Sequence, residues 1–395
     1  MRICLVNLGA LPALSQEHKH HRIGGEEVQH AQLSAALTKL GHDVTLVVAD
    51  FGQLDGAVYE GVRTLRAYKE AAGLPVLRFV YPRWLKLWSA IARANADVYY
   101  CSCAGMLVGL LAMYCRLHRK RLVFRTASDS DCEPENLLIR YRRDRWLYEY
   151  GLERADAVLV QTATQQRSLK KNYGLDGVVA DMIVAKPMNA EASMAKDIDV
   201  LWISNLRHVK RPDRLLELAR AMPDCRFHMA GGPSPDEEDV FRRIEVEARA
   251  IPNLTFHGGV PYLDVGALFA RARLFANTSD LEGFPNTFLQ AWVRGIPVVT
   301  MFDPDDVVQR EGLGSAHSAV AGMAAGIEML LLSGETYAAA SSATRAFMKE
   351  RFGDDRVLAP YLVALAGAEV QMTAELRAVK ASMAVVDEVA DGRRR

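Results

Sequence analysis

The sequence predicts an α/β protein of two doubly wound domains, each a parallel sheet with helices on both faces. Apolar segments of strand length alternate with amphipathic segments of helical length along the whole chain. The chain has 395 residues, of which 50% are hydrophobic, and this is enough apolar material for two separate cores. Residues 186–196 have no strand pattern and precede a new apolar strand, so we place the boundary between the domains there.

The first domain, residues 1–187, is expected to hold a series of short apolar strands with helices between them. The strands are Arg2 to Asn7, Asp43 to Val48, Val62 to Ala67, Asp97 to Cys101, Leu122 to Arg125, Ala157 to Val160 and Met182 to Val184. Helical connections of this kind join parallel strands. The first helix is expected over Val28 to Leu40.

The second domain, residues 198–354, repeats the same unit. Its expected strands are Val200 to Ser204, Arg226 to Ala230, Leu254 to Phe256, Leu274 to Asn277 and Ile296 to Met301, and its helices are expected to begin at Pro212, Glu237, Leu263 and Pro285. Helices dominate from Ala319 onward, with Tyr337 to Phe352 and Asp355 to Leu365 the clearest. We assign residues 355–395 to a C-terminal helix and tail.

Charge is balanced overall but unevenly distributed. Of 48 basic and 48 acidic residues, residues 1–187 carry 25 and 19, which leaves 23 and 29 for residues 188–395. Basic clusters at residues 116–121 and 140–145 supply most of the first excess. A positive surface there suits anionic lipid head groups or a phosphate-bearing molecule, and it equally suits solvated helix ends. We expect no nucleic-acid partner.

No segment approaches the ~20 apolar residues needed to span a bilayer, and the chain opens on a strand without a signal-peptide layout. We therefore expect a cytoplasmic protein, with peripheral contact at the inner membrane face as an option for the basic N-terminal domain. Residues 81–93 mix aromatic side chains with cations at helical spacing. An interfacial helix would have this pattern, but we favour core packing for its apolar face.

The cysteines favour a reducing compartment. The six cysteines have no metal-ligand spacing, and a chain of this length does not need disulfides to hold a core. Cys101 and Cys103 fall at the end of a predicted strand, where we expect buried thiols rather than a redox pair.

The most informative segment lies in the second domain, where the strand Leu274 to Asn277 enters a polar loop that holds the acid Glu282. Pro285 then opens an amphipathic helix with its fixed φ and missing N–H, so unpaired amides face the loop beside Glu282. Such a helix start attracts phosphate, and a nearby carboxylate can hold sugar hydroxyls. The segment therefore predicts a nucleotide-sugar site.

The run Glu282-Gly283-Phe284-Pro285-Asn286-Thr287, then Gln290 and Gly295-Ile296-Pro297-Val298-Val299, resembles the donor-binding segment of retaining glycosyltransferases of family 4. The family pattern is Glu, seven residues, Glu, and a Gly-x-Pro-Val-Val strand. The resemblance implies the GT-B fold, in which two Rossmann-like, doubly wound parallel-sheet domains face each other across a cleft. The second domain would bind most of the donor and the first would bind the acceptor.

The same resemblance implies that Glu282 holds the nucleotide ribose and that residues 283–287 line the donor site. One position departs from the family pattern, because the second acid is replaced by Gln290. Glutamine keeps the size and hydrogen bonding of glutamate but has neither its charge nor its basicity. Gln290 is therefore expected near the transferred sugar, but not as a base or nucleophile.

A second segment, Asn205 to Pro212, resembles the family loop Arg-Leu-x-x-x-Lys-Gly, whose two cations neutralise the donor diphosphate. It follows the first strand of the second domain, where ligands of doubly wound sheets bind. Lys210 matches the family lysine, whereas the family arginine falls on Asn205. Arg207 is expected to supply the missing charge, and fixed cations there would also stabilise the leaving group.

The run Gly24-Gly25-Glu26-Glu27 resembles the family's Gly-Gly-x-Glu turn after the first strand, where small residues let backbone amides approach the donor. The loop before this turn holds His18, His20 and His21. Because the resemblance implies no bound metal, we expect a mobile acceptor loop there and not a metal site.

Other matches to the family are weaker. Residues 125–131 follow a strand after which many family members have a His; here there is none, and Asp129 is expected to contact the sugar or acceptor. Gly258 lies in a loop that resembles the family's Phe-x-Gly loop near the base. In GT-B enzymes a late helix crosses back onto the first domain, and Val357 to Leu365 is the expected crossing segment.

The resemblance implies transfer of a hexose from a nucleoside-diphosphate sugar, UDP fitting best, to a hydroxyl of a glycan, lipid-linked or small-molecule acceptor. The catalytic roles would fall to Lys210, Arg207, Glu282 and Asp129, without a metal or other cofactor. No carboxylate nucleophile is placed by the motifs, so we expect retention by front-face attack. Two alternatives stay open: a non-catalytic nucleotide-sugar-binding assembly partner, motivated by Gln290 and the missing His, and a GT-B epimerase acting on a UDP-N-acetylhexosamine.

Overall fold

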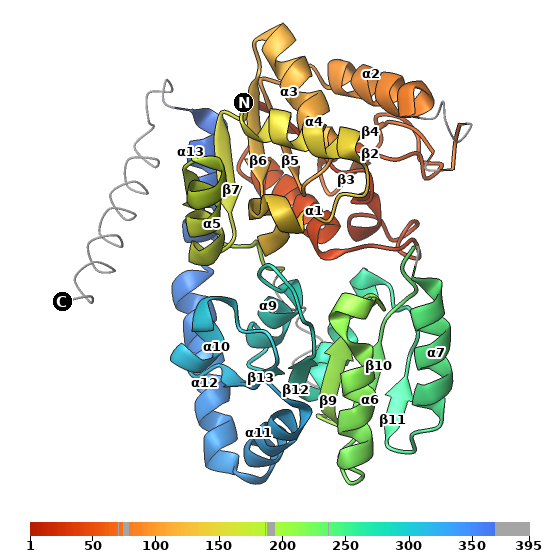
Figure 1. Ribbon diagram of the computed structural model, residues 1–395, viewed down its shortest axis with the longest axis vertical. Coiled ribbons are helices and arrows are strands. Elements are labelled where there is room, and N and C mark those ends of the chain that lie inside the picture. The colour runs from red at the N-terminus through yellow and green to blue at the C-terminus, as the bar shows by residue number, and fades with distance from the viewer. Residues whose placement is uncertain (70, 74–78, 186, 188–193, 236, 368–395) are drawn as a thin grey trace, which may run out of the picture.

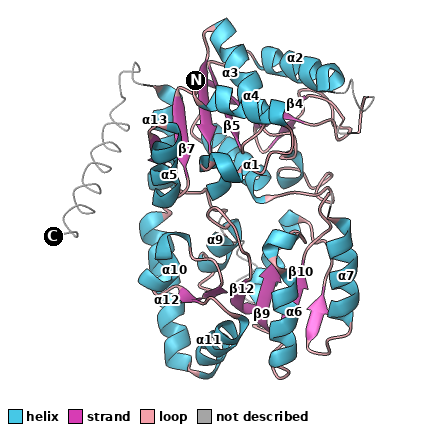
Figure 2. Cartoon of the chain, in the orientation of Figure 1, coloured by secondary structure: helices cyan, strands magenta, loops and turns pink. Residues whose placement is uncertain are grey.

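The computed structural model describes residues 1–69, 71–73, 79–185, 187, 194–235 and 237–367. The chain folds into two α/β domains stacked end to end, the N-terminal one above the C-terminal one in Figure 1. In both, helices cover the two faces of a central sheet (Figure 2). The predicted fold class is confirmed.

The N-terminal sheet has the strand order β3-β4-β2-β1-β5-β6-β7-β8 in the described part of the chain. Its strands are β1 (Arg2–Val6), β2 (Asp43–Val48), β3 (Val58–Tyr59), β4 (Val62–Arg66), β5 (Val98–Ser102), β6 (Arg121–Arg125), β7 (Ala157–Val160) and β8 (Gly177–Val179). Its helices are α1 (Gly25–Lys39), α2 (Leu85–Ala94), α3 (Met106–His118), α4 (Arg142–Leu152) and α5 (Ala163–Tyr173). Neighbouring strands are parallel except β3 and β4, which are antiparallel.

The C-terminal sheet is parallel throughout, with the order β11-β10-β9-β12-β13-β14 among described residues. Its strands are β9 (Ile198–Ile203), β10 (Phe227–Ala230), β11 (Leu254–Phe256), β12 (Ala272–Asn277), β13 (Val298–Thr300) and β14 (Gly314–Ala316). Its helices are α6 (Pro212–Ala221), α7 (Glu238–Arg249), α8 (Gly266–Arg271), α9 (Asn286–Trp292), α10 (Val307–Arg310), α11 (Val320–Leu332) and α12 (Gly334–Arg351).

Each sheet is buried on both faces, as a parallel sheet requires. In β1, Cys4 and Val6 belong to one hydrophobic cluster while Ile3 and Leu5 belong to the cluster on the opposite face. The C-terminal sheet is likewise enclosed by two clusters. The continuous apolar runs of the sequence reflect this two-sided burial.

The last helix, α13 (Asp354–Ala366), returns to the N-terminal domain and lies beside β7 and α5 (Figure 1). Leu358, Tyr361 and Leu365 are buried in a core cluster of that domain. Just before α13, Arg351 forms a two-pronged ion pair with Asp181, 2.7 Å at the closest. The expected crossing helix is therefore confirmed.

Some elements differ from expectation. The strand expected over 182–184 is wrong: β8 lies at 177–179, and 181–184 have no regular structure. The backbone there bonds to side chains instead, because Ile183 N–H donates to Gln29 Oε1 and the carbonyl of Asp181 accepts from Tyr361. The short strands β3 and β14 were not predicted.

The segment 81–93 was expected to pack on the core of the N-terminal domain. Helix α2 buries Leu87 and Ile91 in the core while Trp84 and Trp88 pack partly buried against it, so core packing of the segment 81–93 is confirmed. Most of the boundary segment 186–196 and the tail beyond 367 lie outside the described residues. The predicted domain limits stay predictions.

Candidate donor-binding cleft

A cavity of about 470 Å³ opens between the two domains at the carboxyl ends of both sheets. The N-terminal domain lines it with residues 22–28, Cys103, Ala127, Ser128, Leu138 and Gln161, among others. The C-terminal domain contributes Asn205, Arg207, Lys210, Gly231, Gly232, Val260, Tyr262, residues 281–287 and Gln290, among others. Most of the residues that the motifs singled out therefore meet in one place.

Lys210 and Glu282 form the central ion pair of this cleft. Lys210 Nζ lies 2.5 Å from Glu282 Oε2, and the two side chains are only 19% and 13% exposed. The other carboxylate oxygen accepts from Ser279 Oγ at 2.7 Å and, more weakly, from Asn277 Nδ2 at 3.4 Å. The carboxylate is thus fixed by its own loop, and it in turn holds the ammonium group of Lys210 at the cleft wall.

Arg207 lines the cleft but is paired elsewhere. Its Nε donates to Glu237 Oε1 at 3.1 Å, and the backbone N–H of His208 donates to the other oxygen of Glu237 at 2.6 Å. The Arg207 side chain is 44% exposed, so it has room to turn. Asn205, which stands at the family arginine position, donates instead to the carbonyl of Ile23 in the other domain.

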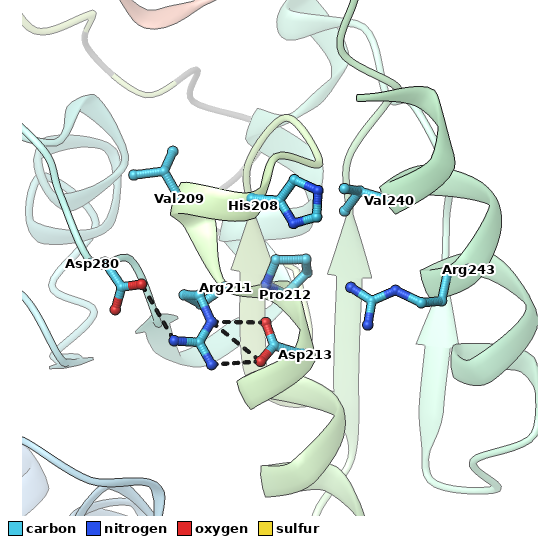
Figure 3. A pocket seen from close by; sticks show the side chains of 8 residues that line it. All are labelled: His208, Val209, Arg211, Pro212, Asp213, Val240, Arg243 and Asp280. Atoms are coloured by element: carbon cyan, nitrogen blue, oxygen red, sulfur yellow. Dashed lines mark hydrogen bonds and ion pairs between the residues drawn. The ribbon is translucent and has the colours of Figure 1, made fainter. Parts of the chain in front are cut away.

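A second pocket, of about 430 Å³, adjoins the loop that carries Lys210 (Figure 3). Its walls include Arg211, Asp213 and Asp280, and Figure 3 shows Arg211 joined to both carboxylates. Arg211 takes a left-handed backbone conformation, φ 48°, between the 3₁₀ turn η7 (His208–Lys210) and α6. Since Asp280 also donates its N–H to Val209, this pocket ties the cation loop to the loop of Glu282.

The segment before α9 is docked onto the N-terminal domain. The buried N–H of Phe284 donates to Gln161 Oε1 at 2.6 Å. Asn286 Nδ2 donates to the carbonyl of Gly25 at 2.7 Å, and its Oδ1 accepts from Gln29. The N–H of Phe284, which precedes the helix that Pro285 opens, is therefore paired with the other domain. Helix α9 itself is only 7 residues long.

Glycines are needed here for close approach between the domains. A Cβ at Gly283 would lie 2.3 Å from Gln161 Oε1 and 2.5 Å from the carbonyl of Ala127. A Cβ at Gly25 would lie 2.7 Å from the side chain of Asn286. The glycines were predicted to make room for a donor, and in this structure they make room for the opposite domain.

Glu26, at the start of α1, forms the N-terminal wall of the cleft. Its carboxylate accepts from Ser102 Oγ at 2.7 Å, from Arg125 at 3.2 Å and from Gln161 Nε2 at 3.1 Å. Arg125 is fully buried, and its guanidinium also lies 6.0 Å from the ring centre of Tyr361 on α13. Neither Arg125 nor Gln161 was singled out from the sequence.

Asp129 is not among the residues that line this cleft. Its carboxylate accepts from Gln165 at 2.9 Å, and burial raises its pKa. The conformation of that loop is fixed by Asp131, whose carboxylate accepts from the N–H groups of Ala127 and Ser128. These hydrogen bonds place both residues at the cleft. Burial raises the pKa of Asp131 to about 6. Asp129 as a sugar contact stays a prediction without support from its position.

The remaining predicted residues are placed as follows. The cleft lining includes Gly24, Pro285, Thr287 and Gln290. Gly258 is not part of the lining, but its carbonyl accepts from the N–H of Gly231, which is. His18 is buried and packs edge-on against Tyr59. Within the described ranges, no three His, Cys, Asp or Glu side chains are grouped so that they could hold a metal ion.

Comparison with known proteins gives the same assignment for both halves. Residues 23–182 match the family described as Glycosyltransferase Family 4, and residues 186–346 match Glycosyl transferases group 1. D-inositol 3-phosphate glycosyltransferase of Mycobacterium tuberculosis is 27% identical over 164 residues. That match covers 38% of this chain and spans about a third, 34%, of the relative's own length.

Solved structures share the fold over nearly the whole chain. Sucrose-phosphate synthase from Thermosynechococcus elongatus superposes with a TM-score of 0.72 at 16% identity, covering 91% of this chain and 96% of the other. HepE from Anabaena, solved with UDP and glucose, gives 0.71 at 15% identity, covering 93% and 99%. The family matches on both domains and these superpositions together show that the chain belongs to the family 4 glycosyltransferases with the GT-B fold.

Proposed function

We propose that this protein transfers a hexose from a nucleoside-diphosphate sugar, UDP fitting best, to a hydroxyl group, with retention at the anomeric carbon. The observation that carries the proposal is the Lys210–Glu282 pair, held at 2.5 Å on the cleft wall opposite Glu26. A cation for a diphosphate beside a carboxylate for hydroxyls is what a donor of this class requires. The solved HepE complexes, which contain UDP and UDP-glucose, support the choice of nucleotide.

The C-terminal side chains would share the donor. Lys210 would move from Glu282 to the diphosphate, and Arg207 would turn from Glu237 to add a second charge. Glu282 and Gln290 would then hold donor hydroxyls from the same wall of the cleft. As the bond to the sugar breaks, the diphosphate gains negative charge, so both cations would stabilise the transition state more than the bound substrate.

Front-face attack fits the carboxylates present. Gln290 cannot act as nucleophile or base. Glu26 has its oxygens engaged by Arg125, Ser102 and Gln161, and burial raises the pKa of Glu27, which favours its neutral acid form. In the proposed step the acceptor oxygen bonds to the anomeric carbon, the bond to the diphosphate breaks, and the acceptor proton passes to the leaving phosphate oxygen. The product therefore keeps the donor's anomeric configuration.

A glycan or lipid-linked acceptor would enter from the N-terminal side. Leu138 lines the cleft and is 71% exposed. Beyond it, exposed Tyr141 and Arg143 meet the turn before α2, where the Arg143 guanidinium lies 3.4 Å from the ring centre of Phe79 and Tyr81 is exposed. No helix of the described chain is long and apolar enough to cross a membrane. We propose that this aromatic and basic surface rests on anionic lipid.

Vesicle co-sedimentation tests the membrane contact. Wild type should bind vesicles rich in phosphatidylglycerol more than vesicles of phosphatidylcholine, and Arg143→Glu should reduce that binding. Arg249→Glu, at an exposed arginine of α7 in the other domain, is the matched control. Equal loss in both variants would point to general charge attraction and would contradict a specific surface.

Product analysis tests the reaction itself. A panel of UDP-, GDP- and ADP-sugars is offered with a mixed acceptor set, and the new anomeric centre is assigned by NMR. Transfer with retention is expected. Transfer with inversion would overturn the mechanism, while conversion of the sugar without transfer would indicate the epimerase. Nucleotide-sugar binding without turnover would favour the non-catalytic assembly partner, for which Gln290 is the supporting observation.

A further inference from the structure

The segment Gln161 to Thr164, which joins β7 to α5 and includes the first two residues of α5, contacts the C-terminal domain at two points. Gln161 Oε1 accepts from the N–H of Phe284 at 2.6 Å. The carboxylate of Asp305 accepts from the N–H of Ala163 at 2.8 Å and from Thr164 Oγ1 at 2.6 Å. No sequence motif identifies this segment. It nevertheless forms hydrogen bonds with the loop between β12 and α9, residues 278–285, called the donor loop below, and with the segment before α10.

The orientation of the Gln161 amide is fixed by its surroundings. Its Nε2 lies 3.1 Å from Glu26 Oε1 and 3.1 Å from the carbonyl of Thr126, and both of these are acceptors. Its Oε1 must therefore point across the domain boundary, where it meets the N–H of Phe284. Gln161 is 2% exposed, so water does not substitute for these partners. A neutral amide is suited to this place because it donates to a carboxylate and accepts from an N–H at once.

The donor loop is shaped to reach Gln161. Gly283 approaches so closely that a Cβ there would lie 2.3 Å from Gln161 Oε1. Glu282 immediately precedes this contact and is 2.5 Å from Lys210. The hydrogen bond from Phe284 N–H to Gln161 therefore fixes the donor loop only two residues after Glu282, the proposed donor-binding carboxylate.

The second contact, at Asp305, involves a strained backbone conformation. Asp305 and Asp306 both have positive φ, 50° and 55°, which non-glycine residues rarely adopt. This conformation places the Asp305 carboxylate on the first N–H groups of α5, a favourable position for an anion. The strain is thus maintained by a contact that exists only while the two domains are together.

We propose that Gln161 is a positioning residue that links closure of the cleft to placement of the donor loop. When the domains meet, Gln161 joins Glu26 on the N-terminal wall to Phe284 on the C-terminal wall, and Asp305 binds the first two residues of α5 just beyond Gln161. Loss of the link leaves the donor able to bind the C-terminal domain but leaves Glu282 unaligned with Glu26. This inference rests on the proposed transferase function.

The expected kinetic effect is on turnover. In Gln161→Leu, kcat should fall roughly ten- to a hundredfold, because a misplacement of about 1 Å has that cost, whereas the Kd for UDP should change less than threefold. The matched control is Gln166→Leu. Gln166 lies five residues further on, and its amide donates to the carbonyl of Gly177 within its own domain. It should leave both constants unchanged.

Gln161→Glu gives a readout that a purely structural role would not move. The new carboxylate would face Glu26, and two carboxylates that share a site raise the pKa of one of them. The protonated acid can again donate to Glu26 and accept from Phe284 N–H. The kcat of this variant, relative to wild type, should therefore recover as the pH falls from about 8 to about 6.

Hydrogen exchange tests the link without relying on activity. The peptide that contains Phe284 should exchange faster in Gln161→Leu than in wild type and in Gln166→Leu. Unchanged exchange and unchanged kcat would overturn the proposal, and so would a Gln161→Glu variant whose relative kcat ignores pH. If wild type shows no transfer with any donor, the proposed function fails, while the exchange result still decides whether Gln161 holds the donor loop.

Discussion

Lys210 and Glu282 neutralise each other before any donor arrives. Both are largely buried in the cleft wall, and Glu282 also accepts from Ser279. A donor diphosphate would take over the lysine charge, and donor hydroxyls would take over the carboxylate. This pairing holds both side chains in place on the cleft wall, which is the preorganisation that electrostatic catalysis needs.

Lys210→Ala tests this pairing in the absence of ligand. The variant leaves the Glu282 carboxylate without its cation, so the free energy of unfolding should fall by about 1–2 kcal/mol, less than for a fully buried pair. Lys170→Ala, at an exposed lysine paired with Asp176, should be nearly neutral. Urea denaturation of the two variants makes the comparison, and equal stabilities would mean that the pair contributes nothing before binding.

Gln290→Glu tests the departure from the family pattern. The change restores an acid at a position that lines the cleft. A charged acceptor binds a sugar hydroxyl about twice as strongly as a neutral one, so kcat/KM for the preferred donor should rise several-fold. A fall in kcat/KM would show that this cleft is adapted to an amide, and steady-state kinetics with one donor decides between the two.

The sequence could bring together residues whose positions depend on local spacing from a strand. Lys210 and Glu282 sit on loops that directly follow β9 and β12, so knowing the strands was enough to bring them together. Gln161 and Arg125 could not be found this way. Each follows or ends a strand as an ordinary polar residue, and its partners, Phe284 and Glu26, are set by the tertiary arrangement.

At the scale of elements, the strands β10 and β11 are joined by a histidine pair. His228 Nδ1 and His257 Nε2 are 3.0 Å apart, with Arg271 and Asp197 as charged neighbours. Burial lowers the pKa of His228 to about 4, with His257 adding to the effect, and burial also lowers the pKa of His257. The hydrogen bond requires a ring that accepts, so it is lost once both rings are protonated.

The pair predicts acid sensitivity. Because the folded-state pKa of His228 lies below its unfolded value, the unfolded chain binds more protons, and stability is lost as pH falls from about 6.5 towards 4. Allowing for solvent exposure, the loss is about 1 kcal/mol. Tm should drop less between pH 7 and pH 5 in His228→Gln than in wild type. His20→Gln, at an exposed histidine, is the control, and its pH profile should match wild type.

The donor loop before α9 gives a second test at this scale. Gly283→Ala places a Cβ 2.5 Å from the carbonyl of Ala127, so the loop and the opposite domain must move apart. We expect kcat to fall at least tenfold with the Tm of the C-terminal domain nearly unchanged. Gly334→Ala, where a Cβ meets nothing within 4 Å, is the control. Full activity in Gly283→Ala would argue against a closed working state.

Element prediction succeeded where burial is two-sided and failed at short edges. The interior strands β2 and β7 and the start of α6 were predicted with the observed limits, because apolar runs between turn residues leave little choice. Of the short edge strands β3, β8, β11 and β14, only β11 was predicted. The stretch 182–184 has the same apolar composition, but the N–H of Ile183 donates to the side chain of Gln29. The carbonyl of Asp181, just before this stretch, accepts from Tyr361 of α13. No local pattern in the sequence distinguishes these cases.

At the scale of the whole molecule, contacts across the cleft define one arrangement of the two domains. Asn205 donates to Ile23 O, Lys19 pairs with Asp264 at 2.9 Å, and Gln32 donates to Tyr262 at 2.8 Å. Helix α13 and the Arg351–Asp181 pair join the domains on the other side. The two-domain architecture was predictable from the repeat of strands and helices. The closed arrangement was not, because it is set by single hydrogen bonds between distant residues.

In the proposed function, the cleft binds a nucleotide sugar through Lys210 and Glu282. A thermal-shift panel of UDP, GDP, ADP and their common sugars on wild type, Lys210→Ala and Glu282→Ala tests it most directly, since a ligand of the native state raises Tm. We expect one nucleotide series, that of UDP, to raise the Tm of wild type, and we expect each substitution to remove most of this shift. Absence of a shift with every nucleotide, or an equal shift in all three proteins, would contradict it.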